Sequence, residues 1–367
     1  MSTSLLERPT RTQVRPAPEE PLTLGNAFER AWDAPLAVKL HWILRIGVAL
    51  EFFGHGLAGL YRSPAWIPYF TLFGFSKQFS HDHLYYVTGT FDIAMATLVL
   101  VRPMRASLVY MAFWGMFTAW LRPITGESWF ELVERGANYG MPLAFLMLSG
   151  LPGRSIGSWF ERVRPSAELS ADLARWLGWV MQGSIALLLI GHGGLGIFAD
   201  KKEWYDFFGW FGISKATVSS QHLMQWVGIF EVALGIAVLV KPLRWLLVSV
   251  LVWKVGTELL RPLVGQPNFQ FIERAGDYVL PVALLWVLAS LRSVVTTPFI
   301  TPQPVVYAPT PADYYSPAVV VPSAPAPAPR PPERRTPDPD VLAAAAALNA
   351  RLAARRSGRE DAEAVRR

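Results

Sequence analysis

The sequence has no cysteine in its 367 residues. This absence excludes disulfide bonds, thiolate nucleophiles and cysteine-ligated zinc or iron–sulfur centres within the chain. Charge is also scarce, because Asp, Glu, Lys and Arg make up 17% of the residues and apolar residues 52%. That balance, together with 15 Trp and 21 Phe, is typical of a protein with its helices in a bilayer and its aromatic side chains at the interfaces.

Two further absences limit the classes of protein to which this chain can belong. The first 20 residues lack the apolar run of a secretory signal peptide, so the first spanning helix is expected to direct insertion. The histidines show no zinc-ligand spacing, and no metal site is expected. The net charge of +6 is spread over the termini and loops, which indicates membrane topology and membrane lipid as a partner rather than nucleic acid.

An internal repeat organises the chain. The offset between the copies changes by only two residues, from 137 at GHG (191 − 54) to 139 at VRPMR (240 − 101). The matching segments are GHG (54–56 and 191–193), FGFSK and FGISK (73–77 and 211–215), VRPMR and VKPLR (101–105 and 240–244), and ER…Y..P (134–142 and 273–281). We infer a tandem duplication.

Each copy contains four apolar segments near the ~20 residues that cross a hydrocarbon core. The predicted spans are 40–61, 83–103, 105–121 and 131–150, then 174–198, 222–241, 244–260 and 271–291. The predicted fold is an all-α polytopic membrane protein, with eight transmembrane helices in two four-helix repeats. Because four is an even number, both repeats start from the same side and are parallel. Lys and Arg in the N-terminal arm, the central linker and the turns between spans 2 and 3 place both termini in the cytoplasm, with the protein in an inner or plasma membrane.

The composition divides the chain into seven parts, of which those after the second repeat are poor in apolar core residues. They are a cytoplasmic arm (1–38), the first repeat (39–150), a cytoplasmic linker (151–172), the second repeat (173–292), a Pro/Ala-rich linker expected to be disordered (293–339), a short helix (340–358) and a disordered tail (359–367). The short helix is either a docking peptide for a protein partner or a nascent helix within a disordered tail.

Between spans 1 and 2 lie WIPYFTLFGFS and, in the second copy, WYDFFGWFGIS. These segments are too short to cross a bilayer and too aromatic for a free loop, so we expect them at the outer interface. They act either as anchors in an aromatic belt or as a lid over a site for a lipophilic ligand.

Ionisable groups within a membrane are costly, and are therefore functional candidates. On the predicted topology, these candidates and two nearby tyrosines lie in the outer half of the bilayer: His55, His83, Asp92, Arg122, Glu134, Arg135 and Tyr139 in the first copy, and His192, His222, Glu231, Arg261, Glu273, Arg274 and Tyr278 in the second. One interpretation is that they connect helices at the interface. The other is a polar pocket that binds a headgroup or moves protons.

Each GHG motif allows a ring or macrocycle to approach the backbone closely. His55 and His192 have the equal depth that a bis-histidine haem b would require. The alternatives are that each histidine hydrogen-bonds a quinone carbonyl or a neighbouring helix.

A short outer loop joins spans 3 and 4, so we expect ion pairs Arg122–Glu134 and Arg261–Glu273. Arg135 and Arg274 would then face the acids of span 2 or a bound anionic or carbonyl group. The copies have diverged: Arg45 and Glu51 correspond to Gln182 and Leu188, and Gly115 and Ala119 to Lys254 and Glu258. At most one copy is therefore expected to keep a working pocket.

The motifs LRIGVALEFFGHG in span 1, and FDIAMATLVLVRPMR or FEVALGIAVLVKPLR in span 2, resemble the DoxX-like family of four-helix membrane proteins. The resemblance covers about residues 40–150 and 173–291. It implies a membrane subunit of a quinone-linked redox complex, with Asp92 and Glu231 as the family's second-span acid. The doubled architecture, the ER…Y motif and the long tail depart from the family pattern.

The leading hypothesis is an integral membrane subunit of a larger complex that binds a quinone or similar lipophilic redox partner. The alternatives are a small-solute or proton transporter, and a structural scaffold that recruits a partner through its C-terminal tail.

Overall fold

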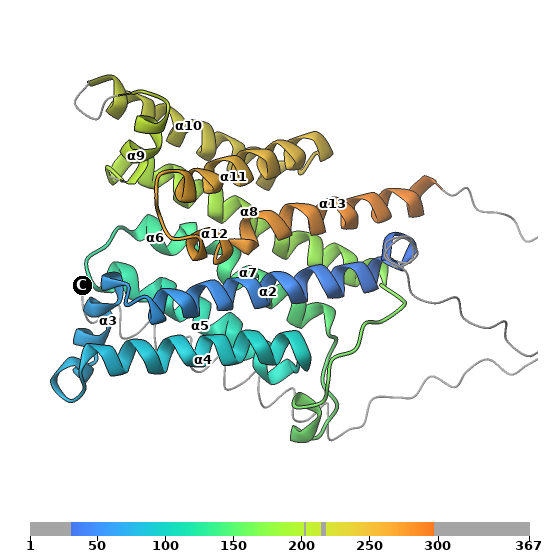
Figure 1. The fold of residues 1–367 in the computed structure, drawn as a ribbon. Coiled ribbons are helices and arrows are strands. Elements are labelled where there is room, and N and C mark those ends of the chain that lie inside the picture. The colour runs from blue at the N-terminus through green and yellow to red at the C-terminus, as the bar shows by residue number, and fades with distance from the viewer. Residues whose placement is uncertain (1–30, 202, 214–217, 297–367) are drawn as a thin grey trace, which may run out of the picture. The chain divides into compact units, whose positions relative to one another are not determined.

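The computed structural model describes residues 31–201, 203–213 and 218–296 (Figure 1). Most of the predicted N-terminal arm, the Pro/Ala-rich linker beyond residue 296, the short helix and the tail lie outside these residues. Apart from one antiparallel bridge between Met104 and Arg162, the described residues contain helices, turns and loops but no strand. The expected all-α class is confirmed for this part of the chain.

The predicted spans all fall on helices. The N-terminal half contains α2 (Leu36–Leu60), α3 (Ile67–Leu72), α4 (His81–Val101), α5 (Arg105–Ile124), α6 (Trp129–Glu134) and α7 (Gly136–Leu148), with short 3-10 turns η1 (Pro64–Trp66) and η2 (Phe75–Lys77). A third turn, η3 (Ile156–Trp159), precedes the C-terminal half. That half contains α8 (Ala171–Phe198), α9 (Glu203–Trp210), α10 (Val218–Val240), α11 (Arg244–Leu263), α12 (Phe269–Ile272) and α13 (Ala275–Thr296).

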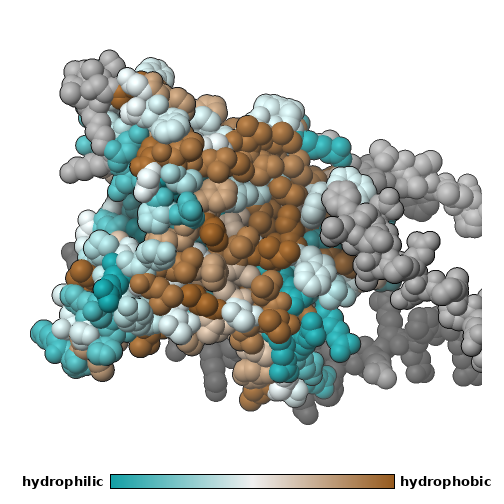
Figure 2. Space-filling model, viewed as in Figure 1, coloured by the Kyte–Doolittle hydropathy of each residue, from teal (hydrophilic) through white to brown (hydrophobic). Residues whose placement is uncertain are grey.

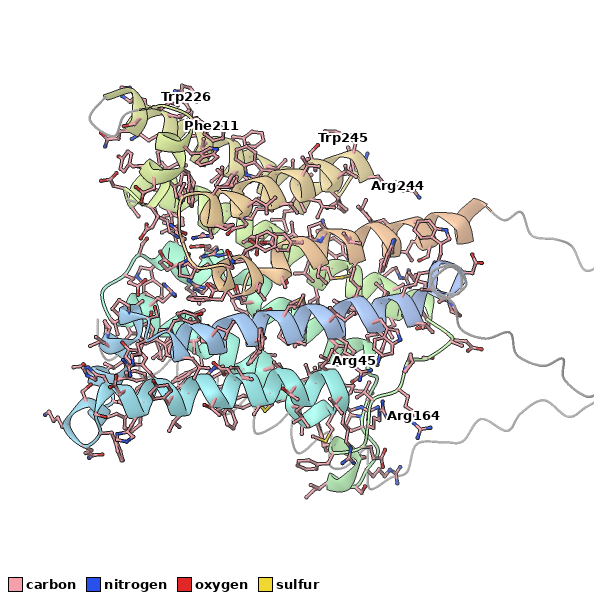
Figure 3. The ribbon with its side chains drawn as sticks, viewed as in Figure 1. Arg45, Arg164, Phe211, Trp226, Arg244 and Trp245 are labelled. Atoms are coloured by element: carbon pink, nitrogen blue, oxygen red, sulfur yellow. The ribbon has the colours of Figure 1, made fainter. Side chains whose placement is uncertain are left out.

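Four helical segments in the described residues are long and apolar enough to cross a membrane: His81–Val101, Ala171–Phe198, Ser220–Val240 and Phe269–Leu291. On the face seen in Figure 2, apolar residues cover the middle of the helices and hydrophilic residues gather towards their ends. Large apolar side chains such as Trp226 and Trp245 project outward (Figure 3). This arrangement is consistent with a membrane protein, because a lipid-facing surface does not need polar cover.

The fourth predicted span of each half is broken rather than continuous. In the N-terminal half α6 ends at Glu134, and α7 begins at Gly136 after Arg135, whose ψ of 16° leaves the helical region. In the C-terminal half α12 ends at Ile272 and α13 begins at Ala275. The expectation of one uninterrupted helix over 131–150 and one over 271–291 is therefore wrong at the Glu-Arg dipeptides.

Each break packs against the GHG motif of the other half. A Cβ atom added to Gly191 would collide with the backbone of Glu134, and one added to Gly54 would collide with the backbone of Glu273. The second glycine of each motif faces its own half, because Gly56 touches α4 at Gly89. Small residues allow helix backbones to approach this closely. The two halves thus interlock through their first and fourth helical segments.

The segment predicted as a linker, 151–172, packs on the helices instead of hanging free. Val163 is buried and its backbone N–H donates to the Pro103 carbonyl (2.7 Å), while Ser158 is also buried. Arg105 donates to the carbonyls of Ser149 (2.7 Å) and Gly150 (3.0 Å) at the end of α7. These contacts tie the connection between the halves to the turn that joins α4 and α5.

Arg45 and Gln182 occupy corresponding positions and have the same structural role. Arg45 donates to the carbonyls of Val99 (3.1 Å) and Val101 (3.2 Å) in the last turn of α4, and also to that of Leu100. Gln182 donates to the carbonyls of Val238 (3.0 Å) and Leu239 (2.6 Å) at the end of α10. Both side chains satisfy carbonyls that a helix end leaves without an intrahelical partner.

Candidate functional site

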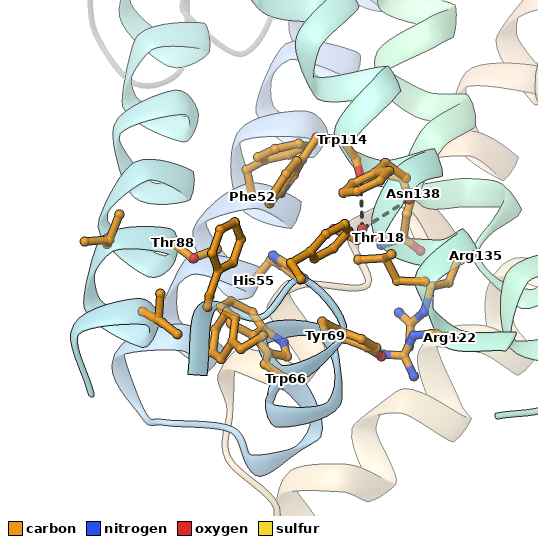
Figure 4. Close-up of a pocket in the computed structure, with 18 of the residues that line it drawn as sticks. Phe52, His55, Trp66, Tyr69, Thr88, Trp114, Thr118, Arg122, Arg135 and Asn138 are labelled. Atoms are coloured by element: carbon orange, nitrogen blue, oxygen red, sulfur yellow. Dashed lines mark hydrogen bonds between the residues drawn. The ribbon is translucent and has the colours of Figure 1, made fainter. Parts of the chain in front are cut away.

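A cavity of about 520 Å³ lies within the N-terminal half (Figure 4). Its walls are largely aromatic, and six of the rings come from the segment between α2 and α4: Trp66, Tyr69, Phe70, Phe73, Phe75 and Phe79. Phe52 of α2, with Trp114 and Phe117 of α5, adds further rings. Cavities of this size with mostly apolar walls and a few polar groups are typical of small-molecule sites.

Polar side chains interrupt the aromatic wall. They are Glu51, His55, Thr88, Thr118, Arg122, Arg135 and Asn138. Figure 4 shows Arg122 and Arg135 together on one side of the cavity, across from Phe52 and Thr88. A ligand with an apolar body and a polar group at one end would match this division.

The segment predicted as either an anchor or a lid covers this cavity. Its α3 helix is held by Tyr69, whose hydroxyl donates to Glu127 (2.9 Å), and Glu127 in turn pairs with Arg122 (2.8 Å). Burial raises the pKa of Tyr69 to about 12, so the phenol stays protonated at neutral pH and remains a donor. The lid interpretation matches this geometry more closely than a simple belt anchor.

His55 joins the cavity to the acid of α4. Its Nδ1 lies 2.8 Å from Asp92 Oδ2, and Trp66 packs against the ring with centroids 4.9 Å apart. Asp92 is fully buried, so the natural arrangement is donation from Nδ1–H to the carboxylate. The nitrogen available to a ligand is then Nε2, which can accept a proton when neutral or donate one when charged.

Three polar atoms at the cavity have no hydrogen-bond partner within the described residues: Glu51 Oε2, Trp114 Nε1 and Arg135 Nε. The contact of Arg135 with Glu131 is long, at 3.8 Å. An unpartnered buried polar atom costs free energy, and such atoms in a cavity are candidates for contact with a ligand. Glu51 was noted in the sequence as a difference between the copies but was not chosen as a site residue; its signal is an isolated acid within an apolar helix.

The C-terminal half holds the corresponding histidine more tightly. His192 Nδ1 lies 2.6 Å from Glu231 Oε2, and Trp204 packs on the ring with centroids 4.7 Å apart. The second oxygen of Glu231 accepts a hydrogen bond from Trp253 Nε1 (2.7 Å). His192 is only 5% exposed and does not line the cavity that His55 lines. The two histidines therefore have separate surroundings, which do not favour a shared haem.

A buried ionic cluster occupies the C-terminal half at the position of the N-terminal cavity. Lys254, which corresponds to Gly115, is fully buried and contacts Glu258 (3.3 Å) and Asp277 (3.2 Å). Glu258 also pairs with Arg261 and lies 3.5 Å from Arg274. Because Lys254 replaces a cavity-lining glycine with a long side chain, the divergence predicted from the sequence distinguishes an open half from a filled one.

The predicted ion pairs Arg122–Glu134 and Arg261–Glu273 are wrong. Arg122 pairs with Glu127 (2.8 Å) and Glu131 (3.2 Å), which are nearer along the chain than Glu134. Arg261 pairs with Glu258, three residues earlier on its own helix. The sequence argument considered only the fourth span, and it missed the carboxylates of the intervening loop and of α11.

Glu134 instead joins the two halves. It accepts from Arg274 (2.8 Å) and Lys201 (2.9 Å), both of the C-terminal half, and its side chain is fully buried. Arg274 therefore contacts Glu134 and Glu258 rather than the acid of span 2, whereas Arg135 lines the cavity.

Of the 14 predicted site residues, His55, Arg122 and Arg135 line the cavity and the other 11 do not. His83 and His222 are exposed near the starts of α4 and α10, and His83 contacts Ser80 Oγ (2.7 Å). Tyr278 donates to the Phe271 carbonyl (3.1 Å) across the α12–α13 break, and Tyr139 is part-buried. Sequence reasoning missed Trp114, Asn138, Asp277 and Lys201 as site or cluster residues, since each looks ordinary within its own segment.

Comparison of the chain with protein-family models, curated proteins and solved structures found no match. The function must therefore be argued from the geometry of the site.

Proposed function

We propose that the protein is an integral membrane protein whose N-terminal half binds a lipophilic, ring-containing ligand of the quinone class. The aromatic walls would stack on the ring, Arg135 would donate a hydrogen bond to a carbonyl oxygen, and His55 would donate one from Nε2 in the protonated form of its ring. The DoxX-like resemblance adds the expectation that the protein works as a subunit of a larger redox complex.

The observation that carries this proposal is the pairing of aromatic walls with unpartnered polar atoms in one cavity. Glu51 Oε2 and Arg135 Nε are buried at a site lined by rings from the lid and from α5. If Glu51 and Arg135 served only to connect helices, protein partners would satisfy both side chains, as Lys201 and Arg274 satisfy Glu134. A ligand carbonyl would supply the acceptor that Arg135 Nε lacks.

The direct test is quinone binding to the purified full-length protein in nanodiscs, followed by tryptophan fluorescence quenching. Organic extraction of the same preparation, with mass spectrometry, would identify any quinone that copurifies. We expect saturable binding by the wild-type protein and at least tenfold weaker binding by Gly115→Lys, which places a lysine where the C-terminal half has Lys254.

The matched control is Gly115→Ala, because its single added carbon leaves most of the cavity open. We expect near-normal binding, with a small adjustment at the Asn138 carbonyl, which lies 3.2 Å from the added carbon. Equal binding by all three proteins, or no binding by the wild type, would contradict the proposal.

We further propose eight membrane spans in two parallel repeats, with both termini in the cytoplasm. The support is that α2, α5, α7 and α11 align with predicted spans, and that Arg45, Arg164 and Arg244 lie toward the same end of the helices (Figure 3). Basic residues favour the cytoplasmic side.

Because the chain has no cysteine, single cysteines report topology directly. Gln78→Cys in the lid segment should react with an impermeant maleimide in intact cells, while Ser155→Cys should react only after permeabilisation. Both positions are exposed, whereas the nearby Ser158 is buried and would give a false negative. The opposite labelling pattern would invert the proposed topology.

The buried ionic cluster favours a second candidate function, transport of protons or a small solute. Lys254, Glu258, Arg274, Glu134 and Lys201 form consecutive contacts of 2.8–3.5 Å between the halves. Chains of buried ionisable groups mark ion and proton pathways in membrane proteins. Proton flux into liposomes containing the protein, abolished by Lys254→Met, would favour transport; flux equal to that of empty liposomes would exclude it.

A further inference from the structure

A second hollow lies on the outer surface of the N-terminal half, between α4 and α5. It has a volume of about 650 Å³ and is lined by Tyr86, Phe91 and Ala94 of α4 and by Tyr110 of α5, among others. Phe91 and Tyr110 pack edge to face with centroids 5.4 Å apart, and Phe91 is 48% exposed. This groove is apolar and open on the side where helices of a membrane protein meet lipid.

The groove adjoins the cavity. Val87, Thr88 and Trp114 line both. In addition, α4 packs much more extensively on α2 than on α5. The α4–α5 seam is therefore the thinner wall of the cavity, and it faces outward.

Trp114 stands at this boundary without the hydrogen bond that fixes its counterpart. Within the described residues, Trp114 Nε1 and Asp92 Oδ1 are both buried and unpartnered. In the C-terminal half, the longer acid Glu231 reaches Trp253 Nε1 at 2.7 Å. Glu231 is one methylene group longer than Asp92. Its hydrogen bond to Trp253 connects α10 to α11, whereas Asp92 and Trp114 form no such bond between α4 and α5.

We propose that the groove between α4 and α5 holds the apolar tail of the ligand, and that the ligand reaches the cavity sideways from the bilayer through this seam. This inference rests on the proposed function and names its ligand class: a quinone-type ring with an alkyl or prenyl tail, rather than a free ring. The ring occupies the aromatic cavity, the tail passes Trp114 and follows Phe91 and Ala94, and its end remains in the hydrocarbon region.

The test compares a tailless ring, 2,3-dimethoxy-5-methyl-benzoquinone, with its decyl derivative, using the full-length protein in nanodiscs. Ala94→Trp would fill the groove while leaving the cavity walls unchanged. We expect it to weaken binding of the decyl compound at least tenfold, and to change binding of the tailless ring less than twofold. Comparing two proteins with the same ligand removes the effect of tail length on partition into the lipid.

The matched control is Ala233→Trp, since Ala233 occupies the corresponding exposed position of α10. It should bind both compounds like the wild type. If the wild type binds both compounds and Ala94→Trp changes neither or weakens both equally, the groove is not a tail site, and the proposed function stands without it. If the wild type binds neither compound, both proposals fail.

Discussion

The two halves of the molecule share a sequence pattern but differ in the size and charge of the side chain at one corresponding position. At Gly115 the N-terminal half leaves a cavity, and at Lys254 the C-terminal half fills the space with a buried ammonium group between Glu258 and Asp277. The histidines differ likewise, since His55 lines a cavity and His192 is enclosed by Glu231 and Trp204. The N-terminal half leaves a cavity at this position, and the C-terminal half places a buried side chain there.

The two halves also differ in how their buried charges are paired. A buried ion pair is a poor source of stability but costs much when one partner is lost. The ionic cluster of the C-terminal half is therefore costly to disrupt, and Glu134 connects the N-terminal half to it. By contrast, the N-terminal half keeps Glu51 and Arg135 with unpartnered atoms.

The largest effect is expected from Glu134→Gln, which breaks the connection between the halves. Lys201 and Arg274 would each lose their closest carboxylate in a buried site. We expect a destabilisation of about 3–5 kcal/mol, seen as a lower Tm in detergent. Among the described residues Glu273 forms no ion pair, so the corresponding change, Glu273→Gln, should cost less than about 1 kcal/mol. Equal losses would mean that the halves are coupled symmetrically.

Separate substitutions of Arg274 and Arg135 distinguish an effect on stability from an effect on ligand binding. Arg274→Gln removes one of the two cations that contact the buried Glu134 and one of the three that contact the buried Glu258, and should cost about 3–5 kcal/mol. Arg135→Gln loses only the long contact with Glu131 and should cost about 1 kcal/mol or less, yet it should weaken quinone binding at least tenfold. The measurements are Tm and fluorescence titration on the same preparations. Arginines equally needed for stability and equally dispensable for binding would make both motifs structural.

The smallest effect is expected at the opposite end of the helices. Arg45→Gln should cost about 1 kcal/mol or less, because Gln182 already bonds the end of α10 in the C-terminal half. Arg45→Ala leaves the carbonyls of Val99 and Val101 without these donors and should cost about 1–3 kcal/mol. The comparison is again by Tm. A loss for Arg45→Gln as large as for Arg45→Ala would mean that the charge itself is required.

Several features could be predicted from the sequence because they depend on local pattern. Apolar segments of spanning length located the long helices to within a few residues. The expectation that the glycines of each GHG motif admit a ring or macrocycle was wrong for Gly54 and Gly191, because the backbone of the other half packs against them. The aromatic segment between α2 and α4 was recognised as a candidate lid. Its six cavity-lining rings are consistent with that interpretation.

The carboxylate that each buried cation contacts could not be predicted from local pattern. Arg122 had three nearby carboxylates in the sequence, and pairing with Glu134 was the wrong choice, because Glu134 contacts Arg274 of the other half. The breaks at Arg135 and after Ile272 were also missed. They reflect contact with Gly191 and Gly54, which lie far away along the chain.

The sequence by itself determined that the chain is helical, apolar and internally repeated, and that its few charges fall at matching places. These properties follow from composition and from periodicity over neighbouring residues. Only the tertiary structure decided which half is open and which carboxylate each cation meets. The physical reason is that a buried charge pairs with whatever the packed helices bring within about 4 Å. Here those partners come from turns between helices far along the chain: Lys201 and Arg274 reach Glu134 across 67 and 140 residues.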